Sequence, residues 1–188
     1  MSSSLKTMVE ECPVIAAIKD EEGLEQCLKT DISIVFVLYG DICSIADIVE
    51  RLKASGKLAM VHIDLITGLS TREIAVDYIR ERTRADGIIS TKPMLIKRAK
   101  ELGLFTIQRF FVLDSMAIEN ISKQTDAHCT DLIEILPGVM PKVIARICRM
   151  ITIPIIAGGL ISDREDVLSA LDAGAVAVST TNRTVWEL

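Results

Sequence analysis

Aromatic residues and histidines are scarce in this 188-residue sequence. Phe, Tyr and Trp together make up 4% of the chain, so the core must be built mainly from the aliphatic side chains within its 49% hydrophobic residues. Few aromatic rings also leave few platforms on which nucleic-acid bases could stack. The five cysteines are scattered and form no C-x-x-C pair, which argues against a structural zinc site and against a disulfide framework.

The sequence also lacks a long apolar run. No stretch approaches the roughly 20 residues that a helix needs to span a bilayer. The opening "MSSSLKTMVEE" lacks the basic start and apolar middle of a secretory signal, so we expect a cytoplasmic protein without membrane contact. The net charge of −5 gives a polyanion no overall attraction, and contact with nucleic acid would require a local basic patch.

Short β-branched runs alternate with amphipathic stretches from one end of the sequence to the other. The nearly continuous apolar content of these runs is typical of parallel strands that are covered on both faces. Strands are predicted over residues 14–18, 32–38, 58–64, 87–90, 104–110, 132–136, 154–157 and 175–179. Helices are predicted over 44–55, 71–82, "TKPMLIKRAKELG", 141–150 and 163–173.

The strand–helix unit recurs roughly every 24 residues, so that about eight units fit the chain. Alternating β and α elements form either an open doubly wound sheet or a closed barrel. Eight units without a long insertion favour the barrel. We therefore predict an α/β protein with one domain over residues 1–188, a compact (β/α)₈ TIM barrel, in which residues 1–12 are flexible or an N-terminal extension.

The strongest functional pattern lies in the seventh and eighth units, where "IIAGGLIS" and "VAVSTTN" end the strands. Barrels of this kind build phosphate sites from the loops after these two strands and from a short extra helix, for which "RTVWEL" supplies residues. Glycines bring backbone N–H groups to an oxyanion, and small hydroxyls add donors. Although a plain turn would also explain the glycines, we predict a phosphate site formed by Gly158, Gly159, Ser179, Thr180, Thr181 and Asn182.

Polar residues at other strand ends extend this predicted site. "VHIDL" places His62 and Asp64 on one face of the expected strand. Because these two side chains alone make a weak metal site, we predict no metal; Asp64 is expected to line the pocket and His62 to lie deeper in the core. "TIQRFFVLD" offers Gln108 and Arg109, of which only one normally points into the mouth of the barrel. Arg109 either reaches a ligand or forms a surface ion pair.

Two further charged residues need partners. A cation such as Lys92 at a helix start opposes the helix dipole unless an anion is near. Glu134 interrupts an otherwise apolar strand, where an unpaired carboxylate would be costly. It therefore requires a Lys, an Arg or ligand hydroxyls, and a pair with Lys19 across the mouth is one candidate.

Basic residues gather on three of the expected helices. Such residues usually form solvated outer faces with partners at i and i+4. No aromatic residues interleave with them for base stacking, so their indication of an RNA surface is weak. They are Arg80, Arg82 and Arg84; Lys97, Arg98 and Lys100; and Lys142, Arg146 and Arg149.

Several short segments of the sequence, taken in this order and at these spacings, resemble those of the bacterial glycerol uptake operon antiterminator family. They are "VHIDLITG", "GIISTK", "IQRFFVLD", "IEILPGVMPKVI", "PIIAGGLI" and "AVSTTNRTVW", and the resemblance runs from Pro13 to Trp186. It implies a (β/α)₈ regulator without enzymatic activity or cofactor, which responds to glycerol 3-phosphate and acts on leader mRNA to prevent early transcription termination. The acidic composition is unusual for an RNA-binding protein, because RNA affinity depends on cations.

Placed on the predicted site, this resemblance would put the phosphate on the glycine and hydroxyl loops named above. Lys19, Lys92 and Arg109 would balance charge, and Asp64, Glu134 or Gln108 would receive the glycerol hydroxyls. An enzyme acting on a small phosphorylated substrate is the main alternative, since similar loops serve many barrel enzymes. A ligand-binding module that acts through protein partners is another. The oligomeric state, including a homo-oligomer, stays open.

Overall fold

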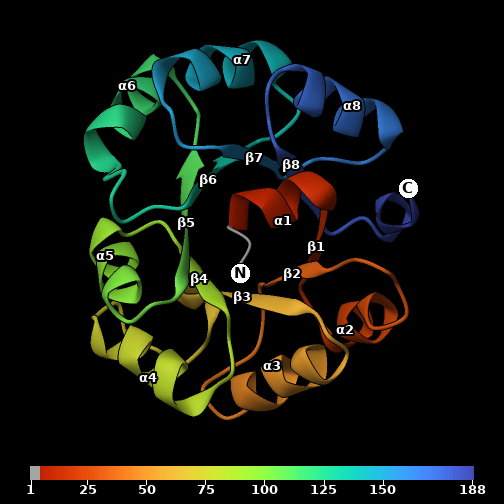
Figure 1. Cartoon of the computed structure of the whole chain (residues 1–188), viewed down its shortest axis with the longest axis vertical. Coiled ribbons are helices and arrows are strands. Elements are labelled where there is room, and N and C mark those ends of the chain that lie inside the picture. Colours follow the sequence, from red (N-terminus) through yellow and green to blue (C-terminus); the bar gives the residue numbers. More distant parts are fainter. Residues whose placement is uncertain (1–4) are drawn as a thin grey trace.

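Residues 5–188 are described by the computed structural model, and residues 1–4 lie outside the described part. Eight parallel strands pair in sequence order, and β8 pairs with β1 to close a barrel (Figure 1). This confirms the predicted (β/α)₈ fold. The strands are β1 (Val14–Ile18), β2 (Ile34–Val37), β3 (Leu58–His62), β4 (Gly87–Ser90), β5 (Phe105–Phe111), β6 (Leu132–Leu136), β7 (Ile155–Gly158) and β8 (Ala177–Thr180).

Helices surround the barrel and connect its strands (Figure 1). Five of them lie where the sequence predicts helices: α3 (Ile45–Ala54), α4 (Ile74–Arg82), α5 (Pro93–Glu101), α7 (Pro141–Met150) and α8 (Arg164–Asp172). Helices α2 (Glu21–Cys27) and α6 (Ser115–Gln124) were not predicted, although each follows an Asp N-cap. Within residues 5–188, no helix has the length and apolar character needed to cross a membrane.

The interior of the barrel is filled by alternate residues of the strands. Ile34 and Phe36 of β2 belong to this interior cluster, together with Met60 and Ile107 from β3 and β5. The residues between them, such as Val35, contact the helices instead. Because both faces are covered, the strands carry the near-continuous apolar runs that the sequence shows.

Helix α1 (Leu5–Glu11) precedes the first strand and lies across the end of the barrel at which the strands begin (Figure 1). Its Leu5 and Val9 are buried in the interior cluster with Ile15 and Phe36. The part of the predicted flexible or extended segment that the structure describes is therefore an ordered helical extension that closes one end of the barrel. The other end, where the strands finish, is called the mouth below.

The eighth unit departs from the regular pattern. Strand β8 is followed by the short 3₁₀ helix η2 (Arg183–Glu187). This is the short helix that the sequence predicted for "RTVWEL". The Trp186 indole N–H donates to the carbonyl of Thr180 at 2.8 Å and so fixes η2 to β8. A cavity of about 690 Å³ lies beside η2, lined by residues that precede β1 and β2, such as Cys12 and Asp31, and therefore lies away from the mouth.

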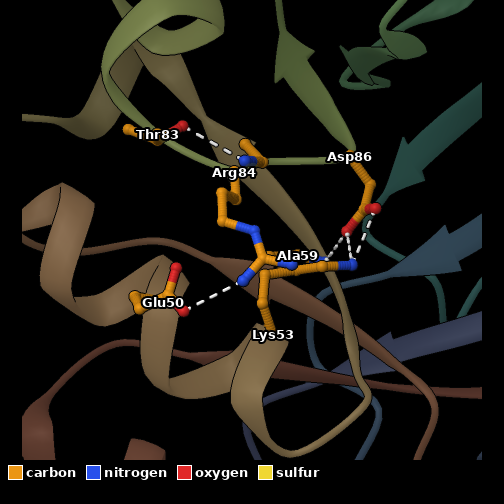
Figure 2. A network of polar contacts seen from close by, with 7 residues as sticks. Glu50, Lys53, Ala59, Thr83, Arg84 and Asp86 are labelled. Atoms are coloured by element: carbon orange, nitrogen blue, oxygen red, sulfur yellow. Dashed lines mark hydrogen bonds and ion pairs between the residues drawn. The ribbon is translucent and has the colours of Figure 1, made fainter.

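Charged side chains between the helices and the start of β4 are paired with one another (Figure 2). Lys53 of α3 donates to both carboxylate oxygens of Asp86 at 2.8 Å, and Asp86 also accepts the backbone N–H of Ala59. Beside them, Arg84 donates to Glu50 at 3.0 Å (Figure 2). The cations in this part of the surface thus have acidic partners within the protein.

Candidate ligand site at the barrel mouth

A buried ion pair lies inside the mouth. Arg109 Nε donates to Glu134 Oε2 at 2.6 Å, and both side chains are almost completely buried. Ser179 Oγ donates to the other oxygen, Glu134 Oε1, also at 2.6 Å. Strand alternation explains the meeting, because Arg109 follows the inward-facing Ile107 by two residues. The predicted need of Glu134 for a cationic partner is confirmed, and the partner is Arg109.

Lys19 is not that partner. Its side chain is exposed, and both oxygens of the Glu134 carboxylate accept hydrogen bonds from Arg109 and Ser179. The suggested Lys19–Glu134 pair is therefore wrong. Lys19 instead lines a cavity of about 330 Å³ beside the mouth, together with Asp20, Thr181, Asn182 and other residues.

Gly158 is required by the packing of this pair. A Cβ at Gly158 would collide with Glu134 Oε1 and would lie 2.6 Å from Ser179 Oγ. Gly159 has a different reason, since its φ of 75° is a backbone conformation that side chains disfavour. The two adjacent glycines of the sequence thus serve close approach of side chains and a left-handed turn, respectively.

The loops after β7 and β8 are tied together by polar contacts. Thr180 Oγ1 donates to the carbonyl of Ile161 at 2.7 Å, and Asn182 Nδ2 donates to the carbonyl of Ser162 at 2.7 Å. The backbone N–H of Asn182 donates to Thr180 Oγ1. The side chains of Thr180 and Asn182 therefore hold the two loops in place, and neither the Thr180 hydroxyl nor the backbone N–H of Asn182 is an uncommitted donor.

These loops and the buried ion pair line one cavity of about 380 Å³. Hydrogen bonds found across residues 5–188 include none donated by the amides of Gly159, Leu160 or Thr181. The carbonyl of Gly159, in contrast, accepts the N–H of Gly138 at 3.0 Å. Five of the six residues predicted for a phosphate site line this cavity, namely Gly159, Ser179, Thr180, Thr181 and Asn182, and Gly158 lies at the adjoining end of β7.

Leu160 was missed by the sequence reasoning. It is the one non-glycine residue with a positive φ, 64°, among residues 5–188, and it is 73% exposed at the edge of the cavity. Strained backbone of this kind persists where surrounding structure imposes it and often marks ligand sites. The sequence carried no signal for it beyond its place after two glycines.

A second polar cluster stands on the other side of the mouth, where β3 and β4 end. Asp64 accepts hydrogen bonds from Ser90 Oγ at 2.9 Å, from the Thr91 amide at 2.8 Å and from Lys92 Nζ at 3.2 Å. Burial works to raise the pKa of Asp64, but the hydrogen bonds from Thr91, Ser90 and Lys92 outweigh it and lower that pKa. The sequence predicted an anion near Lys92, and the structure shows that this anion is the carboxylate of Asp64.

Asp64 does not belong to the strand, contrary to the prediction. β3 ends at His62, and residues 63–65 form the 3₁₀ helix η1 (Ile63–Leu65). His62 is buried as predicted, and its Nδ1 has no hydrogen-bond partner within the described residues. Burial and the nearby Arg109 guanidinium lower the pKa of His62 to about 4, so its ring is neutral at pH 7.

Gln108 lies outside the mouth, which corrects its predicted role. It precedes the inward-facing Arg109, so its side chain points toward the outer layer. There its Nε2 donates to the carbonyl of Gln124 at 3.2 Å, and its Oε1 accepts from Thr130 Oγ1 at 3.4 Å. Of the polyol and charge-balancing residues, the structure therefore brings Arg109 and Glu134 into the 380 Å³ cavity, and Asp64 and Lys92 into the second cluster.

Across residues 5–188, no group of three His, Cys, Asp or Glu side chains has a geometry that could hold a metal ion. Fold and mouth together define a (β/α)₈ barrel whose seventh and eighth loops present backbone amides beside a buried Arg–Glu pair. Loops at these positions form the phosphate sites of many barrels.

The chain belongs to the glycerol-3-phosphate responsive antiterminator family, whose profile matches residues 14–186. It is 45% identical over 181 residues to the Escherichia coli (strain K12) protein YgcP, described as uncharacterized, covering 96% of this chain and 95% of YgcP. The crystal structure of a glycerol uptake operon antiterminator regulatory protein from Listeria monocytogenes matches with a TM-score of 0.89, 32% identity and coverage of 93% of this chain and 95% of that one. The crystal structure of a glycerol uptake operon antiterminator-related protein from Thermotoga maritima matches with a TM-score of 0.80 and 33% identity, and the match covers 93% of this chain and 98% of that one. Aldolases and other proteins match at 10–20% identity, which shows the fold alone.

Proposed function

We propose that this protein is a regulator that binds glycerol 3-phosphate at the barrel mouth and leader mRNA of glycerol-utilisation genes, and that it thereby promotes transcription antitermination. The family assignment supports the metabolite and the regulatory role. One observation of the structure carries the proposed binding site. The loops after β7 and β8 are held together and line a cavity, and the amides of Gly159, Leu160 and Thr181 in this lining donate no hydrogen bond within residues 5–188.

The phosphate is assigned to these loops because backbone N–H groups in a concave turn bind oxyanions without an added cation. Gly159 has no side chain of its own to cover its amide, and Ser179 lines the same cavity. The links from Thr180 and Asn182 to the preceding loop hold the donors in position before the ligand arrives. Such preorganisation reduces the entropy that binding would otherwise cost.

Charge balance for a phosphate cannot come from Arg109 alone, since its guanidinium is bound to Glu134. Lys19 is exposed at the neighbouring cavity, and the Lys92 side chain is 37% exposed beside Asp64. Because both side chains are at least partly exposed, these two lysines are the cations that we propose turn toward a bound anion. In this arrangement the glycerol hydroxyls face the Arg109–Glu134 pair and Asp64.

The family assignment favours a regulator over an enzyme. The two carboxylates of the mouth also have partners within the protein. Glu134 accepts hydrogen bonds from Arg109 and Ser179, and Asp64 accepts them from Ser90, Thr91 and Lys92. We therefore propose that glycerol 3-phosphate is bound and released unchanged.

Calorimetric titration with glycerol 3-phosphate tests this proposal. Gly159→Asp places a carboxylate at the phosphate loops, and we expect binding at least tenfold weaker than in the unsubstituted protein. Gly56→Asp is the matched control, because Gly56 has a similar φ of 76° and lies in open space, on the turn after α3. Equal affinity of both variants would overturn the site, and conversion of the ligand to another compound would overturn the regulator.

A further inference from the structure

Helix α7 differs from the other helices in the charge of its outer face. Lys142, Arg146 and Arg149 are exposed at spacings of four and three residues, which places them on one face of the helix, while Ile144 and Ile147 are buried on the opposite face. The sequence of α7, PKVIARICRM, contains no acidic residue. A stripe of three positive charges therefore runs along the helix for about 10 Å.

Several cations on other helices form ion pairs with acidic side chains. Lys53 pairs with Asp86 (Figure 2), Arg98 with Asp77, and Lys100 with Asp131. Helix α4 carries Arg80 and Arg82, but Asp77 and Glu81 are interleaved with them. Within residues 5–188 no ion pair is found for Lys142, Arg146 or Arg149. In a chain of net charge −5, this face stands out as a local basic patch.

The needs of the helix itself explain only part of the stripe. A cation in the last turn, such as Arg149, is favoured by the helix dipole. Lys142, however, is the second residue of α7, where the same dipole disfavours positive charge. The helix dipole therefore does not account for Lys142, whereas an anionic partner outside the protein would.

The start of α7 is connected to the proposed phosphate loop. Residues 137–140 join β6, which carries Glu134, to α7, and the N–H of Gly138 donates to the carbonyl of Gly159 at 3.0 Å. A ligand bound at the amides of Gly159 and Leu160 would therefore contact a turn that is hydrogen-bonded to the segment leading into α7. This gives a short physical route from the metabolite to the basic face.

We propose that the outer face of α7, formed by Lys142, Arg146 and Arg149, is the surface that contacts the phosphodiester backbone of RNA. The inference rests on the proposed function, and it adds the place at which RNA binds. Charge complementarity selects the partner, because a row of three cations without ion pairs suits a polyanion. The three residues include no aromatic side chain on which a base could stack, so the contact is with the backbone. The contact is therefore sensitive to salt and supplies affinity rather than sequence selection.

The test compares two triple variants of the full chain that remove the same charge. Lys142→Gln/Arg146→Gln/Arg149→Gln alters α7, and Arg72→Gln/Arg80→Gln/Arg82→Gln alters the exposed cations of α4 and the turn before it, a different sector of the barrel (Figure 1). Binding of a labelled transcript of a glycerol-utilisation operon leader is measured with glycerol 3-phosphate at several salt concentrations. Thermal melting and calorimetric binding of glycerol 3-phosphate confirm that both variants remain folded and retain the ligand site.

We expect the α7 variant to bind the transcript at least tenfold more weakly, and its salt dependence, as the slope of log K against log salt, to fall by about 2, since each lost phosphate contact contributes about 0.7. The α4 variant should change the affinity less than threefold. Equal losses in both variants, or no loss in either, would overturn the α7 surface while leaving the proposed function intact. Absence of RNA binding by the unsubstituted protein would overturn both.

Discussion

Two polar clusters face each other at the mouth of the barrel, and they differ in burial. In the first, the Arg109 and Glu134 side chains are 8% and 1% exposed, and Ser179 completes the hydrogen bonding. In the second, Asp64 is 11% exposed but its partner Lys92 is 37% exposed. Both are pairs of opposite charge, yet only the first is sealed from solvent.

This difference in burial indicates which cation could leave its carboxylate and contact a ligand. Removing water from a charge is costly, so Arg109 and Glu134 depend on each other and form a fixed part of the fold. Lys92 keeps contact with water, and its pair with Asp64 is worth little in free energy. We therefore regard the first cluster as the rigid floor of the site and the second as its adaptable side.

The largest expected effect comes from breaking the buried pair. Glu134→Gln leaves the Arg109 guanidinium buried without a counter-charge, which should lower the free energy of unfolding by about 3–5 kcal/mol. Urea denaturation measures this loss. The double variant Arg109→Met/Glu134→Gln, which removes both charges, should recover much of it. A loss below 1 kcal/mol in the single variant would show that the first cluster is not sealed.

Next in size is an effect of pH on His62, which lies near charges of both clusters. An unfolded histidine takes up a proton near pH 6.5, whereas folded His62 does so only near pH 4, so stability falls as the pH drops through this window. His62→Gln removes this titration. The stability of the variant should decline less between pH 6.5 and 4, by roughly 3 kcal/mol. The free energy of unfolding is measured by denaturant unfolding at each pH. If it fell equally with pH in His62→Gln and in the unsubstituted protein, the burial of a neutral His62 ring would be contradicted.

A smaller effect is expected when the space between Glu134 and Ser179 is filled. Gly158→Ala puts a methyl group against both side chains, and overpacking of this kind costs about 1–3 kcal/mol. Thermal unfolding is the measurement. Gly56→Ala, which meets open space, should show only the cost of its positive φ. If Gly158→Ala were as stable as the unsubstituted protein, the contacts described for Glu134 would be looser than the structure indicates.

The smallest effect on stability is expected at the exposed pair. Lys92→Met should change the free energy of unfolding by less than about 1 kcal/mol, because the pair is partly solvated. Glycerol 3-phosphate affinity should nevertheless fall several-fold if Lys92 turns toward the bound anion, and calorimetry separates the two quantities. A large loss of stability with unchanged affinity would reverse the roles assigned to the two clusters.

Sequence patterns predicted the barrel because its strands are nearly pure apolar runs with glycine and proline between them. They also predicted that Glu134 requires a cation, since the cost of a lone buried carboxylate is a local property. The identity of the partner depends on which strand faces which across the barrel, and so Lys19 was suggested where Arg109 belongs. Gln108 was kept in the predicted site together with Arg109, although adjoining strand residues face opposite sides and only one of the two points into the mouth.

The helices α2 and α6 were not predicted, for different reasons. Helix α2 has only seven residues, and its clearest signal is the N-cap at Asp20. Helix α6 carries two local signals that the prediction did not use, the N-cap at Asp114 and the buried pair Ile118 and Ile121 at a spacing of three residues. The left-handed backbone of Leu160 has no signal in the local sequence beyond the two glycines before it. Features that arise from tertiary contacts, rather than from local composition, were the ones that required the structure.

The central claim, that the loops after β7 and β8 bind the phosphate of glycerol 3-phosphate, is tested most directly by following backbone amide resonances during a titration. The account predicts the largest shifts at Gly159, Leu160 and Thr181, with the amides of the 690 Å³ cavity beside η2 unmoved. Saturable shifts confined to that other cavity, or no shift at these three amides while the ligand binds, would contradict it.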